Sequence, residues 1–191
     1  MKHTSGLSIT LAAVWVLSGC AIFEPSAKEG APTHVSASEI SAGYALLYDL
    51  VSKEKQSSLL SIIKEESPEL KSLLERISET SKATAKELET LARINPPLNL
   101  KVTHLPRIEQ ATRESIDKET SKEILHSKGV ALEFNMVSSQ LAGMNYAAHL
   151  ARSLAVVETN PQRKAFLQRT DHKFSELHSQ AYKMLFTRYQ R

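Results

Sequence analysis

The chain has 191 residues, of which 41% are hydrophobic, 24% charged and 6% aromatic, and its formal net charge is +3 at pH 7. Its single cysteine excludes an intramolecular disulfide and a cysteine-rich zinc or iron–sulfur site. The six glycines form no phosphate-binding motif. The weak and interspersed charge is untypical of a nucleic-acid-binding surface. The length suits one main folded domain, and the composition points to no particular activity.

The first twenty residues have the features of a secretory signal that ends in a lipoprotein motif. Lys2 and His3 precede a mostly apolar stretch, 7–17, which suits a signal peptide and is too short to span a bilayer. The stretch ends in Leu17-Ser18-Gly19-Cys20, which resembles the bacterial lipobox. The resemblance implies cleavage before Cys20, diacylglycerol on its sulfur and acylation of its amine. A plain signal peptide with a chance cysteine is the alternative.

The sequence divides into a lipoprotein signal peptide, 1–19, a flexible tether, 20–38, and a helical bundle domain, 39–191. The tether is rich in small and polar residues and contains proline and glycine, as flexible linkers do. Ala21 after the cysteine favours outer-membrane sorting if the organism follows the enterobacterial rule. We expect a lipid-anchored protein of the bacterial envelope, on the periplasmic face of the outer membrane, with inner-membrane sorting left open.

Capping residues predict where the first helices begin and end. Ser38, followed by the acidic Glu39, predicts the start of the first helix, and a break near Ser57-Ser58 would divide it. Ser67-Pro68 places a capping side chain before a proline at the first helical position. Asn95-Pro96-Pro97 ends this second long helix.

Further boundaries follow in the second half of the chain. Thr103 to Pro106 can start the next helix, and Gly129 suits a left-handed residue at its C-terminal end. Asn160-Pro161 repeats the cap-and-proline pattern. The segment 106–127 is the most polar and should be peripheral, whereas 130–157 is apolar on most faces and should be the central, most buried helix.

Apolar residues recur every three or four positions throughout, and no segment alternates as a strand does. We therefore expect an all-α fold, an antiparallel four-helix bundle that gains an extra short helix if the first one breaks.

Short patterns in both halves of the chain carry a family resemblance. They are Ser67-Pro68-Glu69-Leu70-Lys71, Arg76-Ile77, Glu87-Leu88-x-x-Leu91-Ala92, Gly129, Leu132-Glu133, Met136, Gln140, Pro161 and Lys164-Ala165-Phe166. In these positions the chain resembles the bacterial periplasmic ferritin-like family of unknown function, labelled "predicted outer membrane protein". The resemblance covers nearly all of the mature domain and implies a ferritin-like bundle.

That family usually carries histidines that face the bundle interior. Ser81 and Met144 occupy two of these positions, and His178 is displaced by one residue from the third. A shift of one residue turns a helical side chain by about 100 degrees. The departures weaken the hypothesis of an interior metal site.

Two histidine–carboxylate pairs are the remaining candidates for metal binding. Glu123 and His126 match half of a di-iron motif, which needs a second such pair and two further carboxylates. His172 and Glu176 are four residues apart and share a helix face. We interpret the first pair as a solvated helix end and the second as a surface ion pair, and we predict no metal or other cofactor.

A small polar pocket inside the bundle is a further hypothesis. Its candidate residues are Thr80, Ser81, Thr84, Gln140, Met144 and His149. The simpler interpretation is that the hydroxyls bond their own helix and that the methionine fills a gap.

The sequence contains no nucleophile motif, and we predict that the protein is not an enzyme. The first hypothesis is an envelope lipoprotein whose bundle binds a protein or another envelope component. An exposed apolar patch formed by Tyr44, Leu47 and Tyr48 would support it. The alternatives are a metal-binding ferritin-like protein and a carrier of a small ligand, with no nucleic-acid partner in any case.

Overall fold

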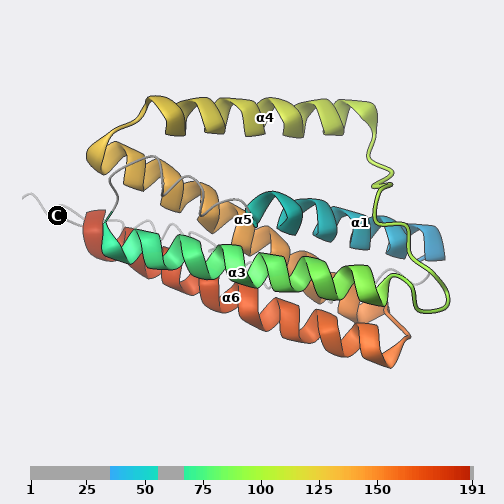
Figure 1. Ribbon diagram of the computed structural model, residues 1–191. Coiled ribbons are helices and arrows are strands. Elements are labelled where there is room, and N and C mark those ends of the chain that lie inside the picture. The colour runs from blue at the N-terminus through green and yellow to red at the C-terminus, as the bar shows by residue number, and fades with distance from the viewer. Residues whose placement is uncertain (1–34, 56–66, 190–191) are drawn as a thin grey trace, which may run out of the picture. The chain divides into compact units, whose positions relative to one another are not determined.

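The computed structural model describes residues 35–55 and 67–189, and within them the chain forms helices and no strands (Figure 1). The described helices are α1 (Ala37–Glu54), α3 (Pro68–Leu91), α4 (Arg107–His126), α5 (Gly129–Val157) and α6 (Pro161–Tyr189). The predicted all-α class is confirmed for these residues. None of the described helices is both long and apolar enough to cross a membrane. The signal peptide, Cys20, most of the tether and Ser57-Ser58 lie outside the described residues.

The predicted cap-and-proline starts of two helices are confirmed. The Ser67 hydroxyl accepts a hydrogen bond from the amide of Leu70 at the start of α3. At the start of α6, Asn160 Oδ1 accepts hydrogen bonds from the amides of Gln162 and Arg163, at 3.0 and 3.1 Å. These side chains satisfy amides that have no partner within their own helix.

Two other boundaries differ from the prediction. The first helix is capped by Ser36 rather than Ser38, because Glu39 completes a capping box with Ser36. Gly129 has the expected positive φ of 54°, but it opens α5 instead of closing α4, which ends at His126. The left-handed residue in the turn between α4 and α5 is therefore the first residue of α5 and not the residue that ends α4.

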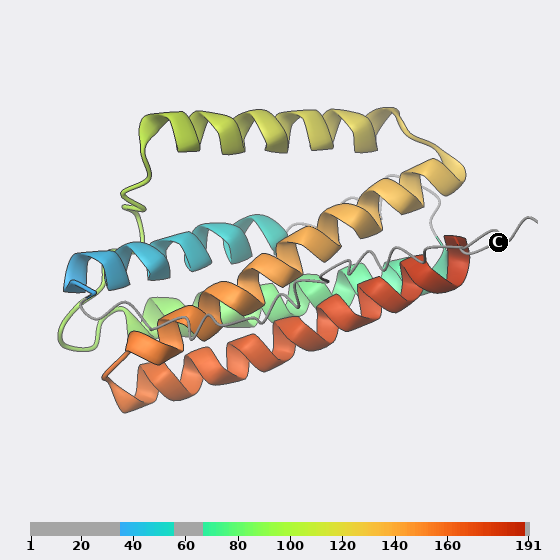
Figure 2. The same ribbon diagram turned by 180° about the vertical axis from the view of Figure 1, so that it is seen from behind.

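Four helices contact one another in a closed ring, in the order α1, α3, α6, α5 and back to α1. Helix α4 packs on α5 and stands apart from the other helices in both views (Figures 1 and 2). Of the described residues 107–126, Ile124 alone is buried, so the predicted peripheral position of this segment is confirmed. Helix α4, with 20 residues, is thus a described helix outside the ring, and the predicted break of the first helix near Ser57-Ser58 lies outside the described residues.

Helix α5 contacts α1, α4 and α6, which confirms its central place. It is not the most buried helix, however. Within the described chain, α3 buries ten of its 24 residues and α5 ten of its 29, because one side of α5 faces α4 across an open space.

The prediction of an exposed apolar patch on the first helix is wrong. Tyr44 and Leu47 are completely buried in the core, and Tyr48 is half-buried. The Tyr44 hydroxyl donates a hydrogen bond to Glu158 Oε2 at 2.7 Å, and Glu158 Oε1 accepts one from the amide of Asn160 at 2.8 Å. Burial and the bond to Glu158 raise the pKa of Tyr44, so it stays a donor. This network ties α1 to the corner between α5 and α6.

A glycine on each helix lets α1 and α5 approach closely. A Cβ at Gly43 of α1 would lie 2.6 Å from Leu154 Cδ2 of α5. A Cβ at Gly143 of α5 would lie 2.9 Å from Glu54 Oε1 of α1. Real Cβ atoms almost never lie this close, so a larger residue at either position would make the end of the Leu154 or Glu54 side chain shift.

Candidate functional site

A cleft of about 630 Å³ lies between α1, α4 and α5. Its apolar lining includes Leu46 and Leu50 of α1, Ile116 and Ile124 of α4, and Ala142 of α5. Its polar lining includes Asp49, Lys53 and Glu54 of α1, Arg113 and Asp117 of α4, and Gln140 and Tyr146 of α5. We call this space the α4 cleft. Polar side chains outnumber apolar ones in this lining, so the cleft suits a ligand that has polar as well as apolar groups.

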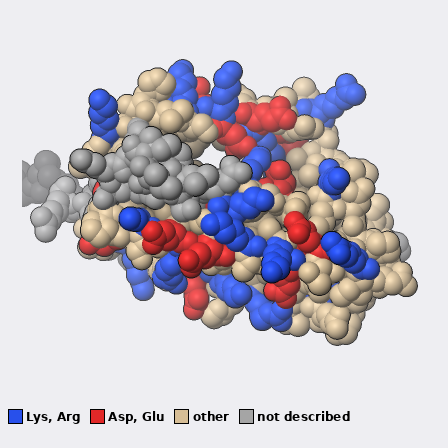
Figure 3. All heavy atoms as spheres, in the orientation of Figure 1, with Lys and Arg blue, Asp and Glu red and all other residues tan. Residues whose placement is uncertain are grey.

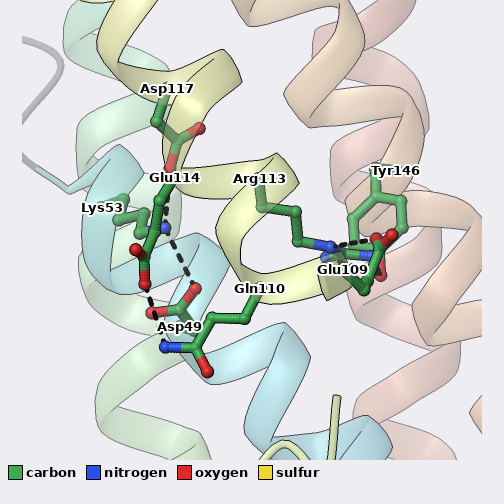
Figure 4. Close-up of polar contacts among 8 residues, drawn as sticks. All are labelled: Asp49, Lys53, Glu109, Gln110, Arg113, Glu114, Asp117 and Tyr146. Carbon is green, nitrogen blue, oxygen red and sulfur yellow. Dashed lines mark hydrogen bonds and ion pairs between the residues drawn. The ribbon is translucent and has the colours of Figure 1, made fainter. Parts of the chain in front are cut away.

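An ion pair joins α1 to α4 at one side of the α4 cleft, and a second pair lies within α1 (Figure 4). Lys53 Nζ lies 2.9 Å from Asp117 Oδ2 and 3.3 Å from Asp49 Oδ2. The hydrogen bond to Asp117 and the charge of Asp49 raise the pKa of Lys53, so it remains a cation. Because these side chains are more than half exposed, each pair stabilises the fold by about 1 kcal/mol or less.

Arg113 joins α4 to α5 on the other side (Figure 4). Its Nε lies 2.7 Å from Glu109 Oε1, and its guanidinium carbon lies 5.3 Å from the centre of the Tyr146 ring. The hydrogen bonds to Glu109 and then to Tyr146 raise the pKa of Arg113. The two anchored cations hold α4 over the space that it encloses with α1 and α5.

A carboxyl group lines the α4 cleft from the α1 side. Glu54 is half-buried and accepts a hydrogen bond from the side-chain amide of Gln140. Burial raises the pKa of Glu54 to about 7, the charge of Asp117 adds to the rise, and the Gln140 bond and Lys53 oppose it. An ionisable group that titrates near neutrality inside a cleft is a common property of functional sites.

Gln140, which lines the α4 cleft, carries a buried acceptor without a described partner. The side chain is 7% exposed, and its buried Oε1 accepts no hydrogen bond from any residue that the structure describes. Such a buried acceptor destabilises a protein by about 1 to 3 kcal/mol. Gln140 Oε1 and the Glu54 carboxyl group therefore lie close together, and both can accept further hydrogen bonds.

The sequence analysis did not predict a role for Glu54 or Gly143, although the sequence pattern around each residue indicates one. Tyr44, Leu47, Val51 and Glu54 follow one another at spacings of three and four, so Glu54 continues the buried face of α1. Gly143 is a glycine in a helix interior, where it is about 1 kcal/mol less favourable than alanine unless close packing requires it. The structure shows that these two signals belong to one contact.

The residues predicted for an interior pocket separate into two groups. Ser81, Thr84, Gln140 and Met144 are buried, whereas Thr80 is half-buried and His149 is exposed. Gln140 lines the α4 cleft, and the other five residues are not part of its lining. Gln140, which was predicted to line an interior pocket, thus lines the α4 cleft at the edge of the bundle.

The histidine pairs lie on the protein surface. His126 Nδ1 is 2.7 Å from the carbonyl oxygen of Lys122, one turn earlier in α4, on the exposed side of the helix. His172 Nδ1 is 3.8 Å from Glu176 Oε1, and both side chains are more than half exposed. In residues 35–55 and 67–189, no three His, Cys, Asp or Glu side chains are placed to hold a metal ion.

Acidic and basic side chains alternate over the face seen in Figure 3, without a region of one sign. Comparison with known protein families, curated protein sequences and solved structures finds no match to this chain. The ferritin-like resemblance therefore stays a prediction.

Proposed function

We propose that this protein is a lipid-anchored protein of the bacterial envelope that binds an envelope component in the α4 cleft and catalyses no reaction. The domain is, in this proposal, an antiparallel four-helix bundle of ferritin-like type with α4 added outside the ring. The observation that carries the proposal is the carboxyl of Glu54, held between α1 and α5 in a cleft of about 630 Å³.

The α4 cleft supports binding of a small component rather than of a flat protein surface. The apolar residues that would have served a protein partner, Tyr44 and Leu47, are in the core. The α4 cleft is a concave space lined by both apolar and polar side chains, and concave spaces of this volume are typical of small-molecule sites.

A tryptophan at position 142 should abolish this binding. Ala142 lines the α4 cleft and is exposed, so Ala142→Trp fills the space without touching the core. We expect mass spectrometry of the chain purified from its own envelope to find a bound molecule on the wild type and none on Ala142→Trp. Ala83→Trp, on an exposed position of α3, is the matched control and should keep the molecule. A wild type without a bound molecule, or equal retention by both variants, would contradict the proposal.

The anchor is tested at Cys20. We expect Cys20→Ser to abolish incorporation of labelled palmitate and to move the chain from the membrane to the soluble fraction, because each buried methylene contributes about 0.8 kcal/mol to anchoring. Ser18→Ala keeps a small residue in the lipobox and should leave the labelling unchanged. Full membrane retention of the Cys20→Ser chain would show that the anchor lies elsewhere.

A further inference from the structure

Among the residues that the structure describes, no cation forms an ion pair with the Glu54 carboxylate. Lys53, its neighbour on α1, is held by Asp49 and Asp117. Arg113 of α4 is held by Glu109 and lies over the Tyr146 ring. Helix α5 contributes neutral groups to the lining, Gln140 and Tyr146 among them. Within the described residues the carboxylate is therefore bonded to an amide, and the two cations that line the cleft pair with other acids, although the charge of Lys53 still lowers the pKa of Glu54.

The two groups that could bind a ligand there are both acceptors. The Gln140 amide group donates to Glu54, which places its Oε1 near the same carboxylate, and this oxygen has no donor among the described residues. A group that satisfies both must donate several hydrogen bonds, and it must be a cation to match the carboxylate. A primary ammonium carries three donors on one compact charge.

We infer that the α4 cleft binds a small organic primary amine, with its ammonium on Glu54 and Gln140 Oε1 and its carbon body against Leu46, Leu50 and Ile116. The inference rests on the proposed function, because it names the ligand class of the same cleft. The raised pKa of Glu54 agrees with it, since a desolvated carboxyl that forms no ion pair with a described residue gains most from a bound cation.

The test compares three probes of equal length, hexylamine, hexanol and hexanoate, by isothermal titration calorimetry. The full lipidated chain is purified in a mild non-ionic detergent, and each probe is also titrated into detergent alone. We expect hexylamine to bind on the order of 10- to 100-fold more tightly than hexanol, as charge-assisted hydrogen bonds would give. Hexanoate should bind more weakly than hexanol, because Glu54 repels it.

Two variants and a pH series locate the amine. Glu54→Gln keeps the size of the side chain, and it should make the affinities for hexylamine and hexanol equal. Glu79→Gln, on an exposed position of α3, should leave the preference for the amine intact. In the wild type the affinity for hexylamine should rise as the pH increases through about 7, where Glu54 ionises, and the affinity for hexanol should stay constant.

The outcomes separate this inference from the proposed function. If hexanol binds as tightly as hexylamine and Ala142→Trp blocks both, the cleft binds ligands and the amine assignment is wrong. If hexylamine binds equally well to Glu54→Gln, its site is elsewhere and the inference fails. If none of the three probes binds the wild type at millimolar concentration, the inference also fails, whereas the proposed function is decided by the molecule that co-purifies with the chain.

Discussion

Arg163→Met should lower the free energy of unfolding by about 3 to 5 kcal/mol, as expected when several buried carbonyl acceptors lose a charged donor. Arg163 is 2% exposed. Its guanidinium donates to the carbonyl oxygens of Leu91 at 3.3 Å, Ile94 at 2.6 Å and Pro96. Methionine fills much of the same space but leaves three acceptors at the end of α3 without this donor.

The charge of Arg163 is stabilised by its place in the fold. The carbonyl groups at the C-terminus of a helix carry partial negative charge, and Leu91 is the last residue of α3. Arg163→Lys keeps the charge but cannot reach three separate carbonyls, so we expect a smaller loss, of about 1 to 3 kcal/mol.

Arg169→Met is the matched control for this prediction, to be measured by urea unfolding followed by circular dichroism. Arg169 lies on the same helix, is more than half exposed and pairs with Glu87 at 2.7 Å. Its loss should change the free energy of unfolding by about 1 kcal/mol or less. Equal losses for Arg163→Met and Arg169→Met would show that the buried carbonyl contacts do not stabilise the end of α3.

Local chemistry made much of the fold predictable. Ser67-Pro68 and Asn160-Pro161 start helices because a side-chain oxygen and a fixed proline φ act within one turn. The start of α1 lies two residues before the predicted one, because Ser36 rather than Ser38 forms the capping box with Glu39. The low apolar content of 107–126 was enough to predict a peripheral helix.

The candidate site could not be predicted in the same way, because it depends on which helices pair. Spacing along α1 places Glu54 on the buried face, but it does not say that Gly143 of α5 lies opposite. The prediction for Tyr44 and Leu47 failed for a related reason. A stripe of apolar residues looks the same in sequence whether it faces a partner protein or another helix of its own chain.

The contact between Glu54 and Gly143 links the packing of the fold to the chemistry of the cleft. A methyl group at position 143 would displace Glu54 Oε1, which lies 2.9 Å from its position. The glycine therefore leaves room for the carboxyl end of Glu54 against α5, although it is less favourable in a helix interior than alanine.

The second large effect is expected in the pH dependence of stability. The pKa of Glu54 is raised from an ordinary value of 4.5 to about 7 in the folded state, mainly by burial. Between these values the folded state binds the proton more tightly than the unfolded state does, so stability falls as the pH rises through this range. Each pKa unit corresponds to about 1.4 kcal/mol, so Glu54 should lower the free energy of unfolding by up to about 3 kcal/mol at pH 8 relative to pH 4.

Glu54→Gln should remove this contribution. The glutamine cannot ionise, and its side-chain oxygen can still accept the hydrogen bond from Gln140. We expect the variant to match the wild type near pH 4 and to be more stable by up to about 3 kcal/mol at pH 8, as measured by urea unfolding across the pH range. Glu79→Gln should follow the wild-type curve at every pH, because Glu79 is exposed on α3. A difference between wild type and Glu54→Gln that does not change with pH would mean that the carboxyl is solvated in the folded protein, and the argument for a desolvated ligand site at Glu54 would then lose its support.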